Sequence, residues 1–348
     1  MKKILLAALM MGATLSTQAQ SKWYDNVKFS GYGMVQYQAS DKYEAETNAF
    51  NLRLVRMALE GRAHEDFYWK AQMQINGNAF DTKADGKTKN NMTIRLVDLF
   101  GEWQKYEFFK VKAGQFKRPF TFENPMHPIT QGFMSYSQNV SKLAGFADRT
   151  GEHASNGRDI GIQFQGDFLK NASGRNLLHY QIGAFNGEGI NTGDADNRKD
   201  IIGGLWVMPI KGLRLGAFGW TGSRAGVGEK NRYALSGEYT ADDWTFRSEY
   251  IHSQGWNAAH TSDKADGIYA LCIAPIEKNK IHVKARYDLY REAKEWGQSK
   301  TLYEVGADYM FTKNLQINVE YARVNERTIA NPDKHNYNMF DVELDFRF

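Results

Sequence analysis

The chain has 348 residues, of which 42% are hydrophobic, 14% aromatic and 24% charged, and its formal net charge is +4. Acidic and basic residues are interleaved throughout, which argues against a nucleic-acid-binding protein because such proteins concentrate basic residues on one face. The 32 glycines against 6 prolines, with the many aromatic residues, favour strands and tight turns over a helix-rich fold.

Residues 1–19 have the pattern of a signal peptide. Two lysines precede an apolar stretch over residues 4–15, and the small residues Thr17 and Ala19 predict cleavage after Ala19. An N-terminal membrane anchor is the alternative, but the apolar stretch is too short to cross a hydrocarbon core of about 30 Å. We therefore expect residues 20–348 to form the exported protein.

Sixteen strands are expected along the exported chain, because apolar and polar residues alternate with a period of two in many separate segments. The mean hydropathy of −0.58 fits strands with one apolar and one polar face. In chain order the expected strands are 27–39, 50–62, 66–77, 92–104, 107–116, 158–168, 177–186, 200–209, 213–222, 231–240, 243–254, 267–275, 279–290, 301–311, 315–326 and 337–348.

The connections between these strands alternate in length. Tight turns are expected at 211–212, 241–242, 277–279 and 312–314, whereas the neighbouring connections are expected to have roughly eight residues or more. Short turns on one side and long loops on the other are typical of outer-membrane barrels. Unpaired backbone groups cannot face lipid, so the predicted fold class is all-β, a closed transmembrane antiparallel β-barrel of about sixteen strands.

Residues 117–157 form the one connection that is too long for an ordinary surface loop. A barrel of this size would be wide open unless something entered it. We therefore expect this segment to fold into the lumen and constrict it, with a short helix within residues 133–146. A mobile external loop is the alternative.

The last strand is the clearest, because residues 340–348 alternate without exception between apolar and charged side chains. Four charges on one face and a terminal aromatic, Phe348, favour a wall between lipid and water over a strand of a soluble sandwich. A terminal Phe also resembles the signal that outer-membrane proteins present to the barrel-assembly machinery.

Several motifs resemble those of the phosphate-selective porin O and P family. The matching residues are Gly114–Phe120 followed by Glu123, then Arg158–Gly161, then Asn186–Gly187, and the order extends over most of the mature chain. The resemblance implies a homotrimeric porin of the Gram-negative outer membrane, surrounded by outer-membrane lipid. It also implies a loop folded into the lumen and basic side chains that guide small anions such as phosphate or polyphosphate.

The strand pattern places a set of basic residues on the lumen face, and others lie in the long segment. A cation in a narrow passage attracts anions, and arginine can hold phosphate by two parallel hydrogen bonds. The pore-lining and anion-binding candidates are Lys112, Lys117, Arg118, Lys142, Arg149, Arg158, Arg247, Lys284 and Arg286, with Arg56, Lys70, Lys110 and Arg214 as further lumen-facing cations.

Acidic residues share the same lumen face in the predicted strands. They are Glu304, Asp308, Glu320, Asp341, Glu343 and Asp345. Cross-strand pairing that orders the wall is therefore the alternative for each basic residue, and a general porin of little selectivity is the alternative for the whole chain.

Other functional classes lack supporting sequence features. An outer-membrane barrel enzyme needs a nucleophile with a base in reach, and no such motif surrounds His127, His153, Ser135 or Ser137. A plugged transporter needs a domain before the barrel, and a secreted β-rich binding protein would not explain the alternating connections. We expect passive diffusion of small hydrophilic solutes, with no catalytic residue, metal site or cofactor.

Overall fold

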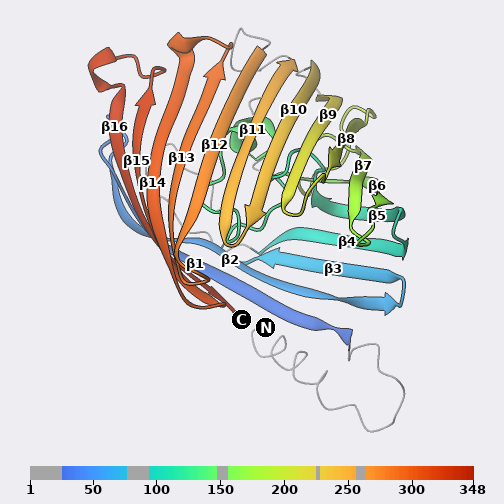
Figure 1. Ribbon diagram of the computed structural model, residues 1–348. Coiled ribbons are helices and arrows are strands. Elements are labelled where there is room, and N and C mark those ends of the chain that lie inside the picture. The colour runs from blue at the N-terminus through green and yellow to red at the C-terminus, as the bar shows by residue number, and fades with distance from the viewer. Residues whose placement is uncertain (1–25, 77–93, 147–155, 225–227, 256–263) are drawn as a thin grey trace, which may run out of the picture.

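A computed structural model describes residues 26–76, 94–146, 156–224, 228–255 and 264–348, so the predicted signal peptide lies outside the described residues. Sixteen antiparallel strands close into one barrel, which confirms the predicted fold class (Figure 1). The strands are β1 (Lys28–Ser40), β2 (Thr47–His64), β3 (Phe67–Gln74), β4 (Arg95–Tyr106), β5 (Phe109–Lys117), β6 (Arg158–Lys170), β7 (Asn176–Phe185), β8 (Asp200–Val207), β9 (Leu213–Arg224), β10 (Gly228–Ala241), β11 (Trp244–Gly255), β12 (Lys264–Glu277), β13 (Ile281–Glu292), β14 (Ser299–Thr312), β15 (Leu315–Glu326) and β16 (Asn336–Arg347).

The helices of the described residues are short. They are α2 (Gln138–Leu143) and two single turns, η2 (Trp296–Gln298) and η3 (Pro332–Lys334). The position of α2 confirms the short helix expected within residues 133–146. None of the helices in the described ranges is long and apolar enough to cross a membrane.

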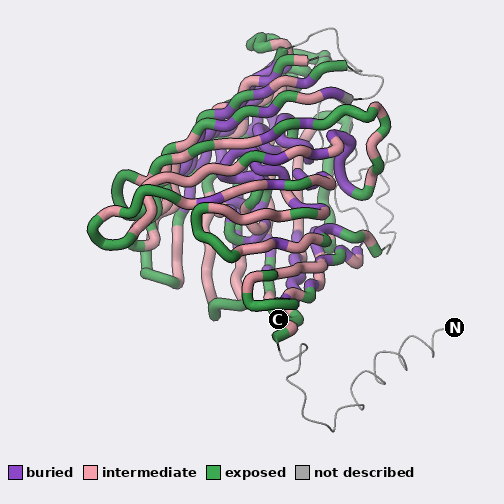
Figure 2. Tube along the Cα trace, turned by 90° about the vertical axis from the view of Figure 1, so that its right-hand side faces the viewer, coloured by how far each residue is buried: buried purple, intermediate pink, exposed green. Residues whose placement is uncertain are grey.

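The barrel wall has an apolar outer face and a polar inner face, because successive side chains of a strand point to opposite sides of the sheet. On β16, Phe340 and Phe346 are 40% and 38% exposed, whereas Glu343 and Asp345 are 1% and 2% exposed. Buried residues lie toward the middle of the molecule and exposed residues lie toward its ends (Figure 2). The period-two pattern of the sequence therefore corresponds to two faces with different surroundings.

The two ends of the barrel differ in their connections, as the sequence predicts. At the end near the C-terminus, strands are joined by short turns such as 65–66, 242–243 and 313–314. At the opposite end, however, the connections 41–46 and 293–298 are shorter than the expected eight residues. The expectation was wrong there because the strands continue pairing beyond their predicted ends, as in the pair Arg224 and Gly228.

The barrel closes where β1 pairs with β16. Gly31 and Phe348 exchange backbone hydrogen bonds of 2.8 and 3.0 Å. The ring of Phe346 lies so close to Gly33 that a Cβ atom there would be 2.4 Å from a ring carbon. Gly33 therefore allows the last aromatic residues to cover the seam between the first and last strands.

Candidate functional site

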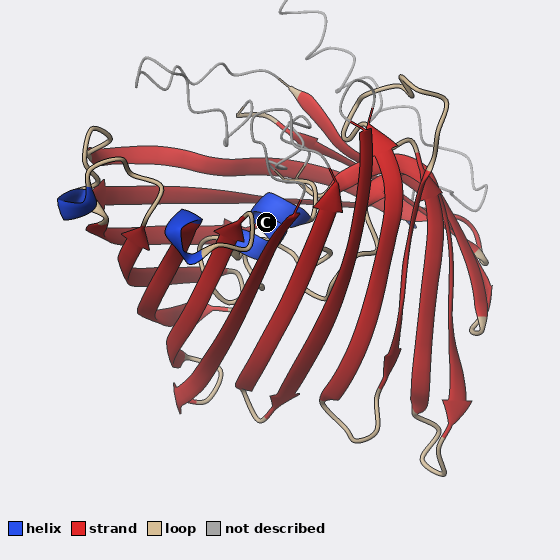
Figure 3. Cartoon of the chain, turned by 90° about the horizontal axis from the view of Figure 1, so that it is seen from above, coloured by secondary structure: helices blue, strands red, loops and turns tan. Residues whose placement is uncertain are grey.

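The connection after β5 contacts the inner face of the opposite wall. Residues 118–146 of this connection are called the β5–β6 segment here, and its helix α2 packs against β11, β12 and β13. Seen from above, helix and loop lie within the ring of strands (Figure 3). Three inner-face carboxylates accept backbone N–H groups of the β5–β6 segment. Glu249 accepts from Phe122 at 3.2 Å and Glu123 at 2.7 Å, Asp288 from Gln138 at 2.8 Å, and Glu320 from Met134 at 2.8 Å.

Three predicted anion-binding residues donate to the same segment. Arg247 donates to the carbonyl of Gln131, Lys284 to that of Gly132 at 2.9 Å, and Arg286 to that of Ser135 at 2.8 Å. The same cations form ion pairs with the wall: Arg247 with Glu238 at 3.2 Å, Lys284 with Glu320 at 2.6 Å, and Arg286 with Glu304 at 2.5 Å. Each of these three cations therefore has a carboxylate partner. This is the cross-strand ion pairing that the sequence analysis gave as the alternative to anion binding.

Aromatic side chains of the β5–β6 segment pack on the apolar part of the inner face. The ring of Phe120 lies 5.5 Å from that of Trp220 in an edge-on geometry, and Val140 and Leu143 of α2 are fully buried in the same cluster as Ile251. Ser137 begins α2, since its hydroxyl accepts from the N–H of Val140 at 3.3 Å. The segment is therefore held by both hydrogen bonds and apolar burial.

The predicted site residues at the start of the β5–β6 segment are bonded to protein groups. The ammonium of Lys117 donates to the carbonyls of Asn124 and Met126, both at 2.7 Å, and to the hydroxyl of Tyr136 at 2.9 Å. These three bonds occupy its three donors. Arg118 is fully buried, pairs with Asp159 at 2.8 Å, and lies over the ring of Trp220.

Two further candidates differ from these. Lys142 is exposed at the end of α2, and its ammonium makes no hydrogen bond or ion pair with the described residues. Arg149 lies outside the described residues, so its predicted role stays a prediction.

A cavity of about 300 Å³ separates the β5–β6 segment from the inner face of β1–β6. We call it the basic cavity, because five cations line it and Asp98 is the only carboxylate among its lining residues. Its polar lining is formed by Arg56, Lys70, Lys112, Lys117, Arg158, Gln72, Asp98 and His127, and its apolar or aromatic lining by Tyr32, Phe100, Phe116, Pro125, Met126 and Pro128.

Carboxylates neutralise some of these cations, but not all. Arg158 holds Asp98 by two hydrogen bonds of 2.6 and 3.0 Å. Lys112 and Lys70 lie 3.6 Å from Glu102 and Glu60, which stand just outside the cavity lining. Five cations against these three carboxylates leave an excess of two positive charges.

Arg56 and Lys117 account for this excess. Arg56 donates to Gln74 Oε1 and to the hydroxyl of Tyr32, both at 3.1 Å, and these acceptors are neutral. The acceptors of Lys117 are neutral as well. Within the described residues, neither cation has a carboxylate within ion-pair distance. Their charges therefore act on whatever occupies the cavity.

A second cavity of about 500 Å³ adjoins the first toward the short-turn end of the barrel. We call it the turn-end cavity. It shares Tyr32, Lys70, Gln72 and His127 with the basic cavity, and its further cations are Lys28, Lys313 and Arg347. The two cavities together follow the inner wall of β1–β6, and the turn-end cavity reaches the turn at 313–314.

His127 lines both cavities, although its place in the sequence gave no sign of this role. Its Nδ1 accepts the N–H of Ile129 at 3.2 Å, so the neutral ring carries its proton on Nε2. The ring meets that of Tyr32 edge-on, with 4.5 Å between centroids. Burial, together with the charge of Lys117, lowers the pKa of this loop residue to about 3. Pro125 and Pro128 restrict the backbone on either side of His127. In the sequence, these two prolines are the feature that points to a fixed position for this residue.

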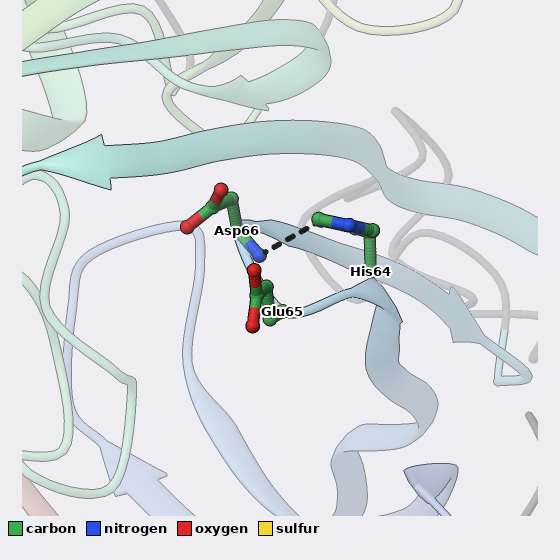
Figure 4. A group of neighbouring side chains, drawn as sticks. All are labelled: His64, Glu65 and Asp66. Atoms are coloured by element: carbon green, nitrogen blue, oxygen red, sulfur yellow. Dashed lines mark hydrogen bonds between the residues drawn. The ribbon is translucent and has the colours of Figure 1, made fainter.

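One group of potential metal ligands occurs among the described residues, at the turn between β2 and β3. His64, Glu65 and Asp66 are consecutive, and His64 and Glu65 are exposed (Figure 4). Nδ1 of His64 accepts the N–H of Asp66 at 3.3 Å, so that nitrogen is already used. Exposed acidic turns of this kind are common without a metal, and nothing else here points to a ligand.

The closed barrel, with an exposed apolar band outside and a polar interior, defines a transmembrane β-barrel of the outer-membrane type. The family model described as Gram-negative porin matches residues 6–328, so the chain belongs to the Gram-negative porin family. It is an outer-membrane channel. No curated protein sequence matches the chain.

Solved structures with the same fold are also porins and channels. The anion-selective porin from Comamonas acidovorans has a TM-score of 0.69 at 13% identity, covering 92% of this chain and 99% of that one. Salmonella typhi OmpF in complex with daunomycin has a TM-score of 0.65 at 12% identity, covering 93% and 98%. The outer membrane channel DcaP of Acinetobacter baumannii has a TM-score of 0.61 at 10% identity, covering 95% and 100%. At such identities the likeness shows the fold alone.

Proposed function

We propose that the protein is an anion-preferring diffusion pore for small hydrophilic solutes, and that the basic cavity and the turn-end cavity form its passage. The excess of positive charge in the basic cavity is the observation that carries this proposal. In a narrow, partly dehydrated passage the field of an unpaired charge is screened far less than in bulk water. Arg56 and Lys117 therefore favour anions over cations.

The β5–β6 segment constricts the pore in this proposal. Its contacts with Glu249, Asp288 and Glu320 support the prediction, because all three carboxylates lie on the polar inner face of the barrel. With the segment against β9–β15, solutes pass along β1–β6. Of the predicted constriction over residues 117–157, residues 147–155 lie outside the described residues, so the contacts that support the proposal come from residues 118–146.

Phosphate is one solute of the proposed class, as the resemblance to the phosphate-selective porin O and P family implies. Arg56 supports this choice because its guanidinium has no acidic partner and can present parallel donors. The ion pairs of Arg247, Lys284 and Arg286 favour the alternative, a general porin of little selectivity, because they remove three candidate cations from the passage.

The biological setting belongs to the same proposal. Residues 1–19 act as the signal peptide, the barrel-assembly machinery recognises the strand that ends at Phe348, and the mature protein forms a homotrimer in outer-membrane lipid. One outer membrane protein of this fold, in-vitro folded OmpT of Vibrio cholerae, is described in a trimer form. Crosslinking of the purified protein in detergent tests this state, and a species no larger than one chain would contradict the trimer.

The reversal potential of the purified protein in a planar bilayer tests the charge preference. In a KCl gradient we expect a potential of anion sign, and Arg56→Gln should move it toward zero. The matched control is Arg323→Gln, since Arg323 is exposed on β15 on the same face as the exposed Tyr321 and lies outside the passage. A potential of cation sign, or equal effects of the two substitutions, would contradict the proposal.

A further inference from the structure

The basic cavity has two chemically different sides. The wall supplies cations, while Phe100 and Phe116 together with residues 125–128 of the β5–β6 segment supply an apolar surface. The rings of Phe100 and Phe116 meet edge-on at 5.9 Å. The ammonium of Lys112 lies over both rings, at 5.0 and 5.5 Å from their centroids. Positive charge and apolar surface therefore meet at the same place.

A hydrated inorganic anion uses only one of these sides. It gains from the charges of Arg56 and Lys117, but it gains nothing from Phe100 or Met126. An organic anion with an apolar body uses both sides, because removing its ring from water adds a favourable term for the area buried. Pockets that combine an apolar lining with a few polar groups are typical sites for such small molecules.

The unpaired charge of Arg56 supports the same type of ligand. Its side chain is almost fully buried and donates only to the neutral Gln74 and Tyr32. A buried cation without a counter-charge is costly, and an entering carboxylate offsets that cost. Guanidinium groups also match carboxylates in geometry. The Nε2–H of the neutral His127 ring supplies a further donor in the lining.

The size of the cavity is suitable for a ring. An apolar cavity of about 150 Å³ accepts benzene, and the basic cavity has about 300 Å³. The difference leaves room for a carboxylate and some water. A larger organic anion would have to displace Met126 or His127, which the β5–β6 segment holds in place.

We infer that the basic cavity is a binding site for small aromatic carboxylates, of which benzoate is the simplest, and that it binds them in preference to inorganic phosphate or acetate. The inference rests on the proposed anion passage. In the bound state the carboxylate faces Arg56, and the ring lies between Phe100 and Met126. Because the cavity lies in the passage, a bound ligand slows the flow of chloride until it leaves.

Block of chloride current through the full-length protein in a planar bilayer tests the site. Benzoate, acetate and phosphate are added in turn at one ionic strength, and the half-blocking concentration of each is measured. Acetate is the matched ligand because it has the carboxylate without the ring. We expect benzoate to block at a concentration about tenfold lower than acetate, since the ring adds buried apolar area, and lower than phosphate.

Variants locate the site. Phe100→Ala should weaken the block by benzoate about threefold, in line with a single ring contact, and leave that by acetate unchanged. Arg56→Gln should weaken both. Phe246→Ala, on the exposed outer face of β11, is the matched control. Heat-modifiable migration verifies folding, and Met126→Ala in the β5–β6 segment replaces Phe100→Ala if the latter does not fold.

The outcomes separate this inference from the proposed function. Equal block by benzoate and acetate, with a reversal potential of anion sign, would overturn the aromatic site and keep the anion pore. Stronger block by benzoate that is insensitive to both Phe100→Ala and Met126→Ala would overturn the assignment to this cavity. A reversal potential of cation sign would overturn both.

Discussion

At the residue scale, the partners of a cation decide whether it can act on a solute. Arg286 and Lys284 donate to the β5–β6 segment and have carboxylate partners. Lys117 also donates to that segment, but its acceptors are neutral. It therefore contributes a positive potential to the passage without offering a donor to a passing ion. Arg56 combines an unpaired charge with a place in the cavity lining.

Substitution of Lys117 tests its role in fixing the segment. Lys117→Met removes three hydrogen bonds from a charged donor, each worth about 1.5 to 3 kcal/mol. We expect the backbone around Asn124 and Met126 to loosen, and limited proteolysis within the β5–β6 segment to become faster. Lys142→Met, at an exposed lysine of the same segment, should leave the cleavage rate unchanged. Equal rates for both variants would contradict the role assigned to Lys117.

The titration of His127 gives a second prediction at this scale. Its pKa is lowered to about 3 by burial and by the charge of Lys117, so the ring is neutral at every pH well above that value. The charged form would appear only as the pH falls toward 3. Between pH 8 and pH 5, conductance of the wild type and of His127→Gln should therefore change in parallel. A step near pH 6.5 that only the wild type shows would mean that His127 is accessible to water and titrates normally.

Whether an individual cation faces the passage or is bonded to protein groups could not be predicted from the sequence. Alternation correctly places Arg247, Lys284 and Arg286 on the polar face of their strands. Whether such a cation meets a solute or a backbone carbonyl depends on the path of the β5–β6 segment, which has no periodic pattern. His127 was missed for the same reason, because its position follows from the turns of the segment.

At the element scale, three inner-face carboxylates that fix the β5–β6 segment come from every second strand. Glu249 of β11, Asp288 of β13 and Glu320 of β15 accept its N–H groups. These strands run in the same direction, so their corresponding side chains form a row across the wall. The segment follows this row, and its apolar residues fill the surface between β9 and β12.

Removal of these three carboxylates tests whether the β5–β6 segment constricts the pore. In Glu249→Ala with Asp288→Ala and Glu320→Ala, each site loses hydrogen bonds worth about 1 to 3 kcal/mol. We expect the segment to detach part of the time and single-channel conductance to rise. The matched triple Glu249→Gln, Asp288→Asn and Glu320→Gln keeps an acceptor oxygen at each site and should change conductance less. Unchanged conductance in the alanine triple would place the constriction elsewhere.

At the scale of the whole molecule, the closed barrel follows from a repeated local pattern. Each strand alternates between lipid-facing and interior residues, and sixteen such segments are long enough to be recognised one by one. Their number and order could therefore be predicted from sequence. Strand ends could not, since pairing such as that of Arg224 with Gly228 extends beyond the alternating stretch.

The last residue contributes to the seam that closes the barrel. Phe348 exchanges two backbone hydrogen bonds with Gly31, and its ring meets that of Phe29 at 6.2 Å. Deletion of Phe348 removes both bonds at the seam, together with the terminal aromatic. We expect a smaller fraction of heat-modifiable, folded protein in outer-membrane fractions, whereas Phe348→Tyr should behave like the wild type. Equal folded fractions for the deletion and the wild type would show that the seam closes without it.

In the proposed pore, the passage follows one side of the interior, because the β5–β6 segment packs against the inner face on the other side. The two halves of the inner wall should therefore tolerate mutation differently. Substitutions at Lys70, Gln72 or Phe100 should change which solutes enter the passage and leave the β5–β6 segment in place. Substitutions at Glu249 or Asp288 should instead disturb the β5–β6 segment. A laboratory population that must take up a bulkier nutrient through this protein should accumulate its substitutions in β3 and β4, where permeability can evolve without loss of the constriction.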